Sequence, residues 1–146
     1  MGAFLYAFDF SYVKQISAIS GLLDFKAQYN NSSVDDAFYF DEHEEEFYTF
    51  DNQSDSFYLQ LSYRPIMAGS DFVKKLEFVG RYSESNTPEG AEWESESSQY
   101  SFGLNYWLSW RSLIKLSYET YDIEGGHGGD GLTNIDSFSI HWAIGF

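Results

Sequence analysis

The feature that most constrains this chain is a strict alternation of apolar and polar residues. Counting back from the C-terminus, every second residue is large and apolar, and the residues between are small or polar. The apolar set consists of Phe138, Ile140, Trp142, Ile144 and Phe146. Successive side chains of a β-strand point to opposite faces, so a period of two predicts a strand with one apolar face.

The same period recurs in six other stretches, and we therefore expect seven strands and no helix. These stretches are residues 4–12, 23–29, 57–63, 76–82, 100–110 and 114–118, and only Trp107 breaks the pattern of its stretch. A chain of 146 residues is enough for one domain. We predict that residues 1–146 form a single all-β domain, an antiparallel meander that is part of a transmembrane β-barrel.

The predicted connections differ in length and charge. They cover residues 14–20, 31–55, 65–73, 84–97, 109–112 and 122–136, so short and long connections alternate. In an antiparallel meander, alternate connections share one end of the sheet, which puts the three long ones together. These three hold 18 of the 23 acidic residues and none of the eight basic ones. The formal net charge of -15 is thus concentrated at one end, and a nucleic-acid partner is not expected.

Alternation alone does not decide whether the apolar face meets lipid or a protein core. Three features favour lipid: the sorted loops, the terminal aromatic residue, and aromatic residues near strand ends, as in the interfacial girdles of membrane barrels. The aromatic residues concerned are Tyr12, Tyr63, Tyr82, Tyr106, Trp107, Trp110 and Tyr118. A soluble sandwich or small barrel, which needs no detergent, remains the alternative fold.

Four stretches resemble a known family, the phosphate-selective porin O and P family. They are residues 78–83, 102–108, 113–119 and 142–146, and the similarity is close over residues 55–146 and loose over the first 54. The resemblance implies an outer-membrane barrel of about sixteen strands, surrounded by lipid and lipopolysaccharide and assembled as a homotrimer. The closing strand, Phe138 to Phe146, is also similar to the signal that the barrel-assembly machinery reads in many outer-membrane proteins.

The strand count indicates that the sequence is the C-terminal part of a longer protein. Complete bacterial single-chain barrels have an even number of strands, whereas seven are predicted. The first ten residues also lack the basic start and cleavage site of a signal peptide. An eighth strand within residues 38–50 would bring the acidic run Asp41 to Glu46 into lipid, so we expect a hairpin outside the membrane there.

The polar sides of the strands supply the candidate functional residues, which are expected to line a pore. They are Asp24, Lys26, Gln60, Arg64, Glu77, Arg81, Asn105, Lys115, Glu119 and His141. With Asp9 and Lys75 added, five cations face four anions, so no strong ladder for anions is expected, contrary to what phosphate selectivity needs. The alternative role for these side chains is pairing that keeps the wall rigid.

Other candidate sites are weaker. The acidic run 41–46 could hold a hard divalent cation, but we favour a solvated acidic loop. Residues 125–133 match only a single copy of a calcium-binding repeat, and we expect a flexible loop there. His141 and Glu119 lack a nucleophile elbow, and the chain has no Cys, so we expect no enzyme, cofactor or metal site.

The sequence thus predicts a channel for passive diffusion of small hydrophilic solutes or ions across the outer membrane. A non-conducting barrel that acts as an adhesin or anchor through its acidic external loops is the second prediction.

Overall fold

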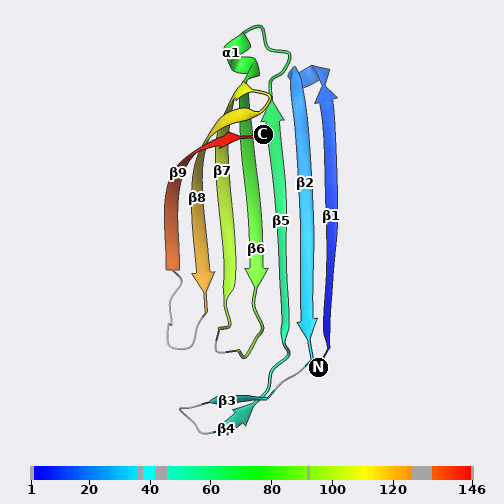
Figure 1. Cartoon of the computed structure of the whole chain (residues 1–146), viewed down its shortest axis with the longest axis vertical. Coiled ribbons are helices and arrows are strands. Elements are labelled where there is room, and N and C mark those ends of the chain that lie inside the picture. The colour runs from blue at the N-terminus through cyan, green and yellow to red at the C-terminus, as the bar shows by residue number, and fades with distance from the viewer. Residues whose placement is uncertain (1, 36–37, 42–45, 92, 126–132, 146) are drawn as a thin grey trace.

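The computed structural model describes residues 2–35, 38–41, 46–91, 93–125 and 133–145, and these form an all-β fold (Figure 1). Seven long strands make one antiparallel sheet in the order β1-β2-β5-β6-β7-β8-β9. Their bounds are β1 (Ala3–Ile16), β2 (Gly21–Val34), β5 (Gln53–Arg64), β6 (Leu76–Asn86), β7 (Glu96–Ser109), β8 (Ser112–Glu124) and β9 (Thr133–Ile144). The predicted seven-stranded antiparallel meander is confirmed.

The sheet is open. In the part of the chain that the structure describes, β1 pairs only with β2, and β9 pairs only with β8. The two edge strands lie at opposite sides of the sheet in Figure 1, and both run from the end that holds the N-terminus toward the other end.

A separate hairpin occupies the segment between β2 and β5. Strands β3 (Tyr39–Asp41) and β4 (Glu46–Tyr48) pair antiparallel as a small sheet of their own, beyond the end of the main sheet (Figure 1). The predicted hairpin is confirmed, whereas its place outside a membrane stays a prediction. Its acidic tip, residues 42–45, lies outside the described residues.

The predicted alternation of short and long connections fails at one place, the connection between β5 and β6. The connection between β5 and β6 has 11 residues (65–75), whereas those at the other end, 87–95 and 125–132, have nine and eight. The strands of the main sheet extend further into the acidic stretches than the alternation indicated, and six of the 18 acids counted as loop residues lie within them. These are Asp55, Glu84, Glu96, Asp122, Glu124 and Asp136.

The expectation of no helix is also wrong, although both helices are short. The 3-10 helix η1 (Ser17–Ile19) joins β1 to β2, and α1 (Asp71–Lys74) lies between β5 and β6. Both occupy connections at the same end of the sheet (Figure 1), which we call the short-turn end, and the opposite end is the long-loop end. No helix in the described ranges has the length and apolar character needed to cross a membrane.

The main sheet has no hydrophobic core. Among the described residues, only Phe50 and Ala91 are buried apolar side chains, and both lie in connections at the long-loop end. No second layer of secondary structure packs on either face of the sheet in Figure 1. The large apolar residues of the strands must therefore lie on an uncovered surface.

Candidate functional site

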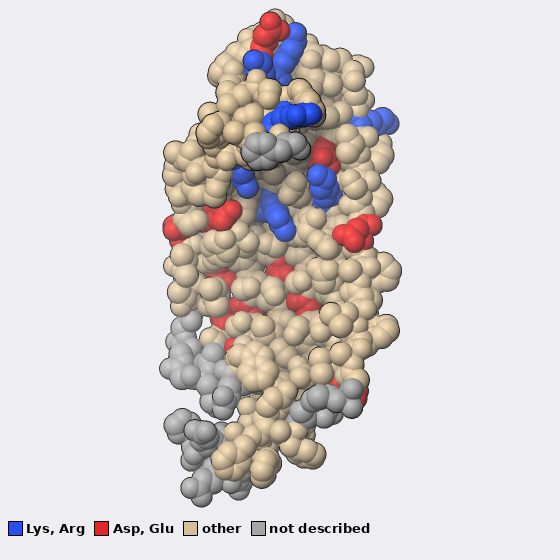
Figure 2. Space-filling model, viewed as in Figure 1, with Lys and Arg blue, Asp and Glu red and all other residues tan. Residues whose placement is uncertain are grey.

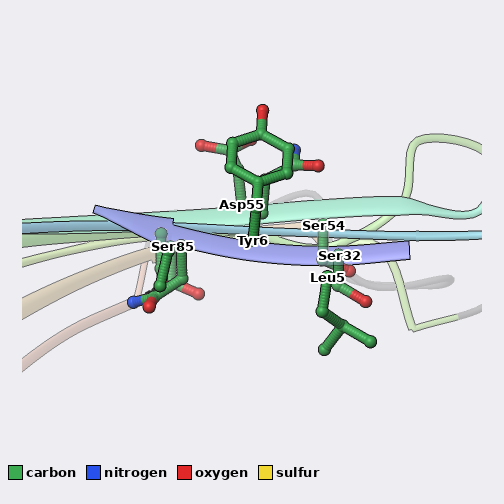
Figure 3. A pocket seen from close by; sticks show the side chains of 10 residues that line it. Leu5, Tyr6, Ser32, Ser54, Asp55 and Ser85 are labelled. Carbon is green, nitrogen blue, oxygen red and sulfur yellow. Dashed lines mark hydrogen bonds between the residues drawn. The ribbon is translucent and has the colours of Figure 1, made fainter. Parts of the chain in front are cut away.

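The strand register separates apolar from polar side chains into two faces. In one row of paired residues, Phe25, Leu61, Phe102, Tyr118 and Phe138 lie side by side across the sheet, joined through Gly80. Figure 3 shows the alternation at the long-loop end, with the side chains of Tyr6 and Asp55 on one side of the sheet and those of Leu5, Ser32 and Ser54 on the other. The pocket drawn there is bordered by side chains from both faces of the sheet, so it is not an enclosed site.

The exposure of the two faces is inverted relative to a water-soluble protein. On the apolar face Leu61 is 51% exposed and Phe102 is 59% exposed. On the polar face Ser62 and Ser117, in the middle of the sheet, are only 4% and 3% exposed. Soluble proteins bury large apolar side chains and expose polar ones, so the apolar face needs a covering other than water.

The apolar face forms a band whose long-loop edge is aromatic on every strand. This aromatic edge consists of Phe4, Tyr29, Phe57, Tyr82, Tyr100, Tyr118 and Phe138. Neighbouring rings are in contact, with centroids 5.8 Å apart for Phe57 and Tyr82 and 4.8 Å apart for Tyr82 and Tyr100. A continuous aromatic edge of this kind is typical of barrels at the border between lipid and water.

The aromatic edge runs obliquely across the sheet. Successive pairings place Phe138 of β9 level with Tyr12 of β1, yet the edge on β1 is at Phe4, eight residues away. Eight residues span about 26 Å, and six strand spacings span about 29 Å. The band is therefore inclined by about 40° to the rows, which matches the tilt of about 35–45° in transmembrane barrels.

On β1 the apolar band covers residues 4 to 12, nine residues, and ends before Lys14. A tilted strand needs about 9–11 residues to cross the hydrocarbon core of a bilayer. The length and the inclination of the band thus both agree with a tilted strand that crosses a bilayer.

The ten predicted pore-lining residues share the polar face. Lys26, Gln60, Arg81 and Glu119 belong to one row of paired residues, and Asn105, Lys115 and His141 belong to another. Asp24, Arg64 and Glu77 lie on the same face in the short-turn half, since Asp24 pairs with Ser62 and Glu77 pairs with Asn105. In Figure 2 the visible Lys and Arg side chains all lie in the half of the molecule that contains the short turns.

Several of these side chains have partners within the face. The Lys26 ammonium lies 3.2 Å from the Asp24 carboxylate, and the Arg81 guanidinium lies over the Tyr58 ring at 4.0 Å from its centroid. The Tyr121 hydroxyl donates to the Glu119 carboxylate at 2.7 Å. Pairing and wall rigidity, the alternative role, therefore describe part of the set.

Two side chains are not where the sequence placed them. Trp107, expected in an interfacial girdle, lies on the polar face, where its Nε1 donates to Glu77 Oε2 at 2.7 Å and its ring lies under Arg64 at 5.1 Å. Lys75 precedes β6 and follows α1, so it is not on a strand face. The polar face therefore carries four cations and four anions among its described residues: Lys26, Arg64, Arg81 and Lys115 against Asp9, Asp24, Glu77 and Glu119.

The sequence reasoning missed a packed cluster at the long-loop end. The Tyr39 and Phe50 rings stack with centroids 4.8 Å apart, and Trp93 meets both edge-on at 5.7 and 5.5 Å. Tyr48 joins them at 5.8 Å from Tyr39. The cluster ties the β3–β4 hairpin to the connection 87–95, and the aromatic spacing in residues 38–50 was the available signal.

The remaining candidates do not form sites in the described residues. His141 pairs with Lys115, two rows from Glu119, and its Nε2 lies 3.1 Å from Ser139 Oγ. No group of three or more His, Cys, Asp or Glu residues in the described ranges is placed to hold a metal ion. Residues 42–45 and 126–132 lie outside those ranges.

The predicted assembly signal occupies the apolar face of β9. Phe138, Ile140 and Trp142 are each between 67% and 69% exposed, and Ile144 is 45% exposed. Phe146 lies outside the described residues.

Comparison of the chain with protein-family models, curated proteins and solved structures gives no match. The resemblance to the phosphate-selective porins therefore stays a prediction from the sequence.

Proposed function

We propose that this chain forms part of the wall of an outer-membrane β-barrel channel through which small hydrophilic solutes or ions diffuse passively. The observation that carries the proposal is the inverted sheet, in which an exposed, inclined apolar band backs a shielded polar face. Lipid covers such a band, and water fills the space along the polar face. The aromatic edge lies at the border between lipid and water.

The channel requires more strands than this sheet contains. Unpaired backbone groups of edge strands cost several kcal/mol each in lipid, so membrane barrels are closed. Because β1 and β9 run in the same direction, closure by antiparallel pairs alone takes an odd number of additional strands between them. The resemblance to larger porins implies that the additional strands belong to the same protein. It also implies that the protein assembles as a homotrimer.

The partners follow from the same proposal. Lipid and lipopolysaccharide surround the apolar band, and the barrel-assembly machinery recognises the β9 strand through its exposed apolar residues. The polar face carries four cations and four anions in its described part, so we propose weak selectivity between ions.

Recording current across a planar bilayer tests the channel, with the protein inserted in the form isolated from cells. The expected result is a series of discrete conductance steps with little preference for cations or anions. Stable insertion without any steps would contradict the channel and leave the second candidate. A protein that stays monomeric and folded in buffer without detergent would contradict both, because the apolar band would then have no lipid to cover it.

The second candidate is a non-conducting barrel that binds other surfaces through its long-loop end. The packed hairpin favours it, because Phe38, Phe40 and Phe47 are 80%, 51% and 72% exposed on the side away from the aromatic cluster. Grafting residues 35–52 together with 87–95 onto an inert barrel tests this function. Transfer of cell-surface binding is expected, and a graft that folds but binds nothing would count against it.

A further inference from the structure

The polar face is divided into a charged half and a neutral half. Its four described cations all lie in rows toward the short-turn end. The two rows beyond them contain amides, hydroxyls and a few apolar side chains, with Asp9 on the edge strand β1 as their only charged member among the described residues. On the central strands these rows comprise Gln28, Tyr58, Ser83, Gln99 and Tyr121, then Asn30, Ser56, Ser85, Ser97 and Ile123.

The neutral half contains a hollow of about 270 Å³, close to the lower end of the usual size of small-molecule sites, about 300–1,000 Å³. Gln28, Tyr58, Gln99 and Tyr121 border it, and each of these side chains is half-buried. The hollow is therefore of a size for one small solute.

Hydrogen bonds hold the wall of the hollow in place. Gln99 Nε2 donates to the Tyr121 hydroxyl at 2.8 Å and to Ser101 Oγ at 3.0 Å, and Ser83 Oγ donates to Gln99 Oε1 at 3.2 Å. On the neighbouring strands Asn30 Nδ2 donates to Ser56 Oγ at 3.4 Å. The Gln99 amide protons and the Tyr121 hydroxyl proton are used within the wall, so these two groups offer oxygen lone pairs to a ligand. Gln28 and Asn30 each keep one amide proton for it.

Two charged residues also border the hollow, and Arg81 is one of them, because its guanidinium lies over the ring of Tyr58, another border residue. The other is Glu84, whose carboxylate accepts a hydrogen bond from the Tyr82 hydroxyl at 2.8 Å on the opposite face. Amides, hydroxyls and guanidinium N–H groups therefore surround the hollow, and the hydroxyl groups of a ligand can pair with all three directly.

We infer that the neutral half is a weak binding site for an uncharged saccharide, held by the amide and hydroxyl groups of Gln28, Asn30, Gln99 and Tyr121. The inference rests on the proposed function, because it treats the polar face as the wall of a solute pathway, and it names the class of solute. Weak binding suits a pathway that a solute must also leave.

Saturation-transfer NMR with maltotriose tests the site on the protein in the form isolated from cells, held in lauryldimethylamine oxide so that the detergent carries no sugar. Saturable binding with a dissociation constant of about 1–10 mM is expected. The Gln99→Leu variant removes the central amide and is expected to weaken binding at least about fivefold. Gln15→Leu is the matched control, since Gln15 lies on the same face near the short-turn end of β1, away from the hollow, and it should change the affinity less than about twofold.

Comparing glucose with glucose 6-phosphate shows whether the site recognises the sugar or a negative charge. Glucose is expected to bind at least as tightly as glucose 6-phosphate. Tighter binding of the phosphate ester, no saturable binding of maltotriose, or equal affinity in the Gln99→Leu variant overturns the inference. If Gln99→Leu does not fold, Tyr121→Phe serves in its place with the same expected direction. If the protein gives conductance steps but does not bind the saccharide, only the saccharide site is contradicted. If it binds the saccharide but gives no steps, the channel is contradicted and the saccharide site stands.

Discussion

At the scale of single residues, Trp107 links two strands on the polar face through a hydrogen bond to a carboxylate. Replacing Trp107 by Phe removes the 2.7 Å bond to Glu77 and keeps a ring under Arg64. A hydrogen bond to a charged group contributes about 1.5–3 kcal/mol, and the half-buried site puts the expected loss near the lower value. Urea unfolding in detergent micelles, followed by circular dichroism, measures the change in the free energy of unfolding.

Trp110→Phe is the matched control for this prediction. Trp110 is 78% exposed and its ring lies beside the Arg111 guanidinium, a contact that Phe retains in weaker form. The expected loss is below about 0.5 kcal/mol. Equal losses in the two variants would show that the bond to Glu77 does not stabilise the sheet.

Two glycines differ in the space that surrounds them. A Cβ at Gly21 would overlap the Tyr63 ring and lie 2.8 Å from the carbonyl oxygen of Arg64. The Tyr63 hydroxyl donates to the Ile19 carbonyl at 2.7 Å, so the ring cannot turn away without losing that bond. Gly21→Ala is expected to reduce the free energy of unfolding by about 1–3 kcal/mol.

A Cβ at Gly80 has no neighbour within 4 Å, so Gly80→Ala should change the same quantity by less than about 0.5 kcal/mol. The same urea titration measures both variants. A Gly21→Ala variant as stable as Gly80→Ala would mean that β2 begins further from β5 than the structure places it.

At the scale of elements, the β3–β4 hairpin is attached to the connection 87–95 by its aromatic rings. Trp93→Ala removes two edge-on contacts, to Tyr39 and Phe50, each worth about 0.5–1.5 kcal/mol beyond buried area. Cleavage by a glutamate-specific protease within residues 42–46 should become about tenfold faster. Mass spectrometry of the timed digest measures the rate.

Phe47→Ala is the control for the hairpin, because Phe47 is 72% exposed and contacts Phe40 on the side away from the cluster. Its cleavage rate should stay within about twofold of the original. A large increase for Phe47→Ala, or none for Trp93→Ala, would contradict the attachment through Trp93.

The sequence predicted the seven strands because a period of two is a local property of each stretch. The predicted strands were too short at the acidic segments. The charges of Glu84 and Asp122 made these residues look like loop residues, although they belong to β6 and β8. It assigned Trp107 to the wrong face by residue type, although its position in the alternation was correct. Its bond to Glu77 joins residues 30 positions apart, and such a partner does not follow from a local pattern.

At the scale of the whole molecule, the inclination of the apolar band and the neutral half of the polar face depend on register across all seven strands. The sequence contained every residue of the aromatic edge, yet nothing in one strand tells which residue of the next lies beside it. The placement of the ten candidate pore residues on one face of the sheet could be predicted, because each position follows from the alternation within its own strand. The division of the polar face into a charged half and a neutral half could not be predicted, because it depends on the register between strands.

The inclined band makes a last prediction about which side of the sheet lipid covers. Leu61 lies near the middle of the band on β5, and Gln60, its neighbour in sequence, lies on the polar face. Arginine at the lipid-facing midplane of a barrel costs about 2–4 kcal/mol, whereas a residue along the water-filled side has no such cost. Leu61→Arg should therefore reduce the free energy of unfolding in lipid vesicles by that amount, and Gln60→Arg should reduce it by less than about 1 kcal/mol. Urea titration in vesicles measures both, and the reverse order would place lipid on the polar face and contradict the channel and the saccharide site together.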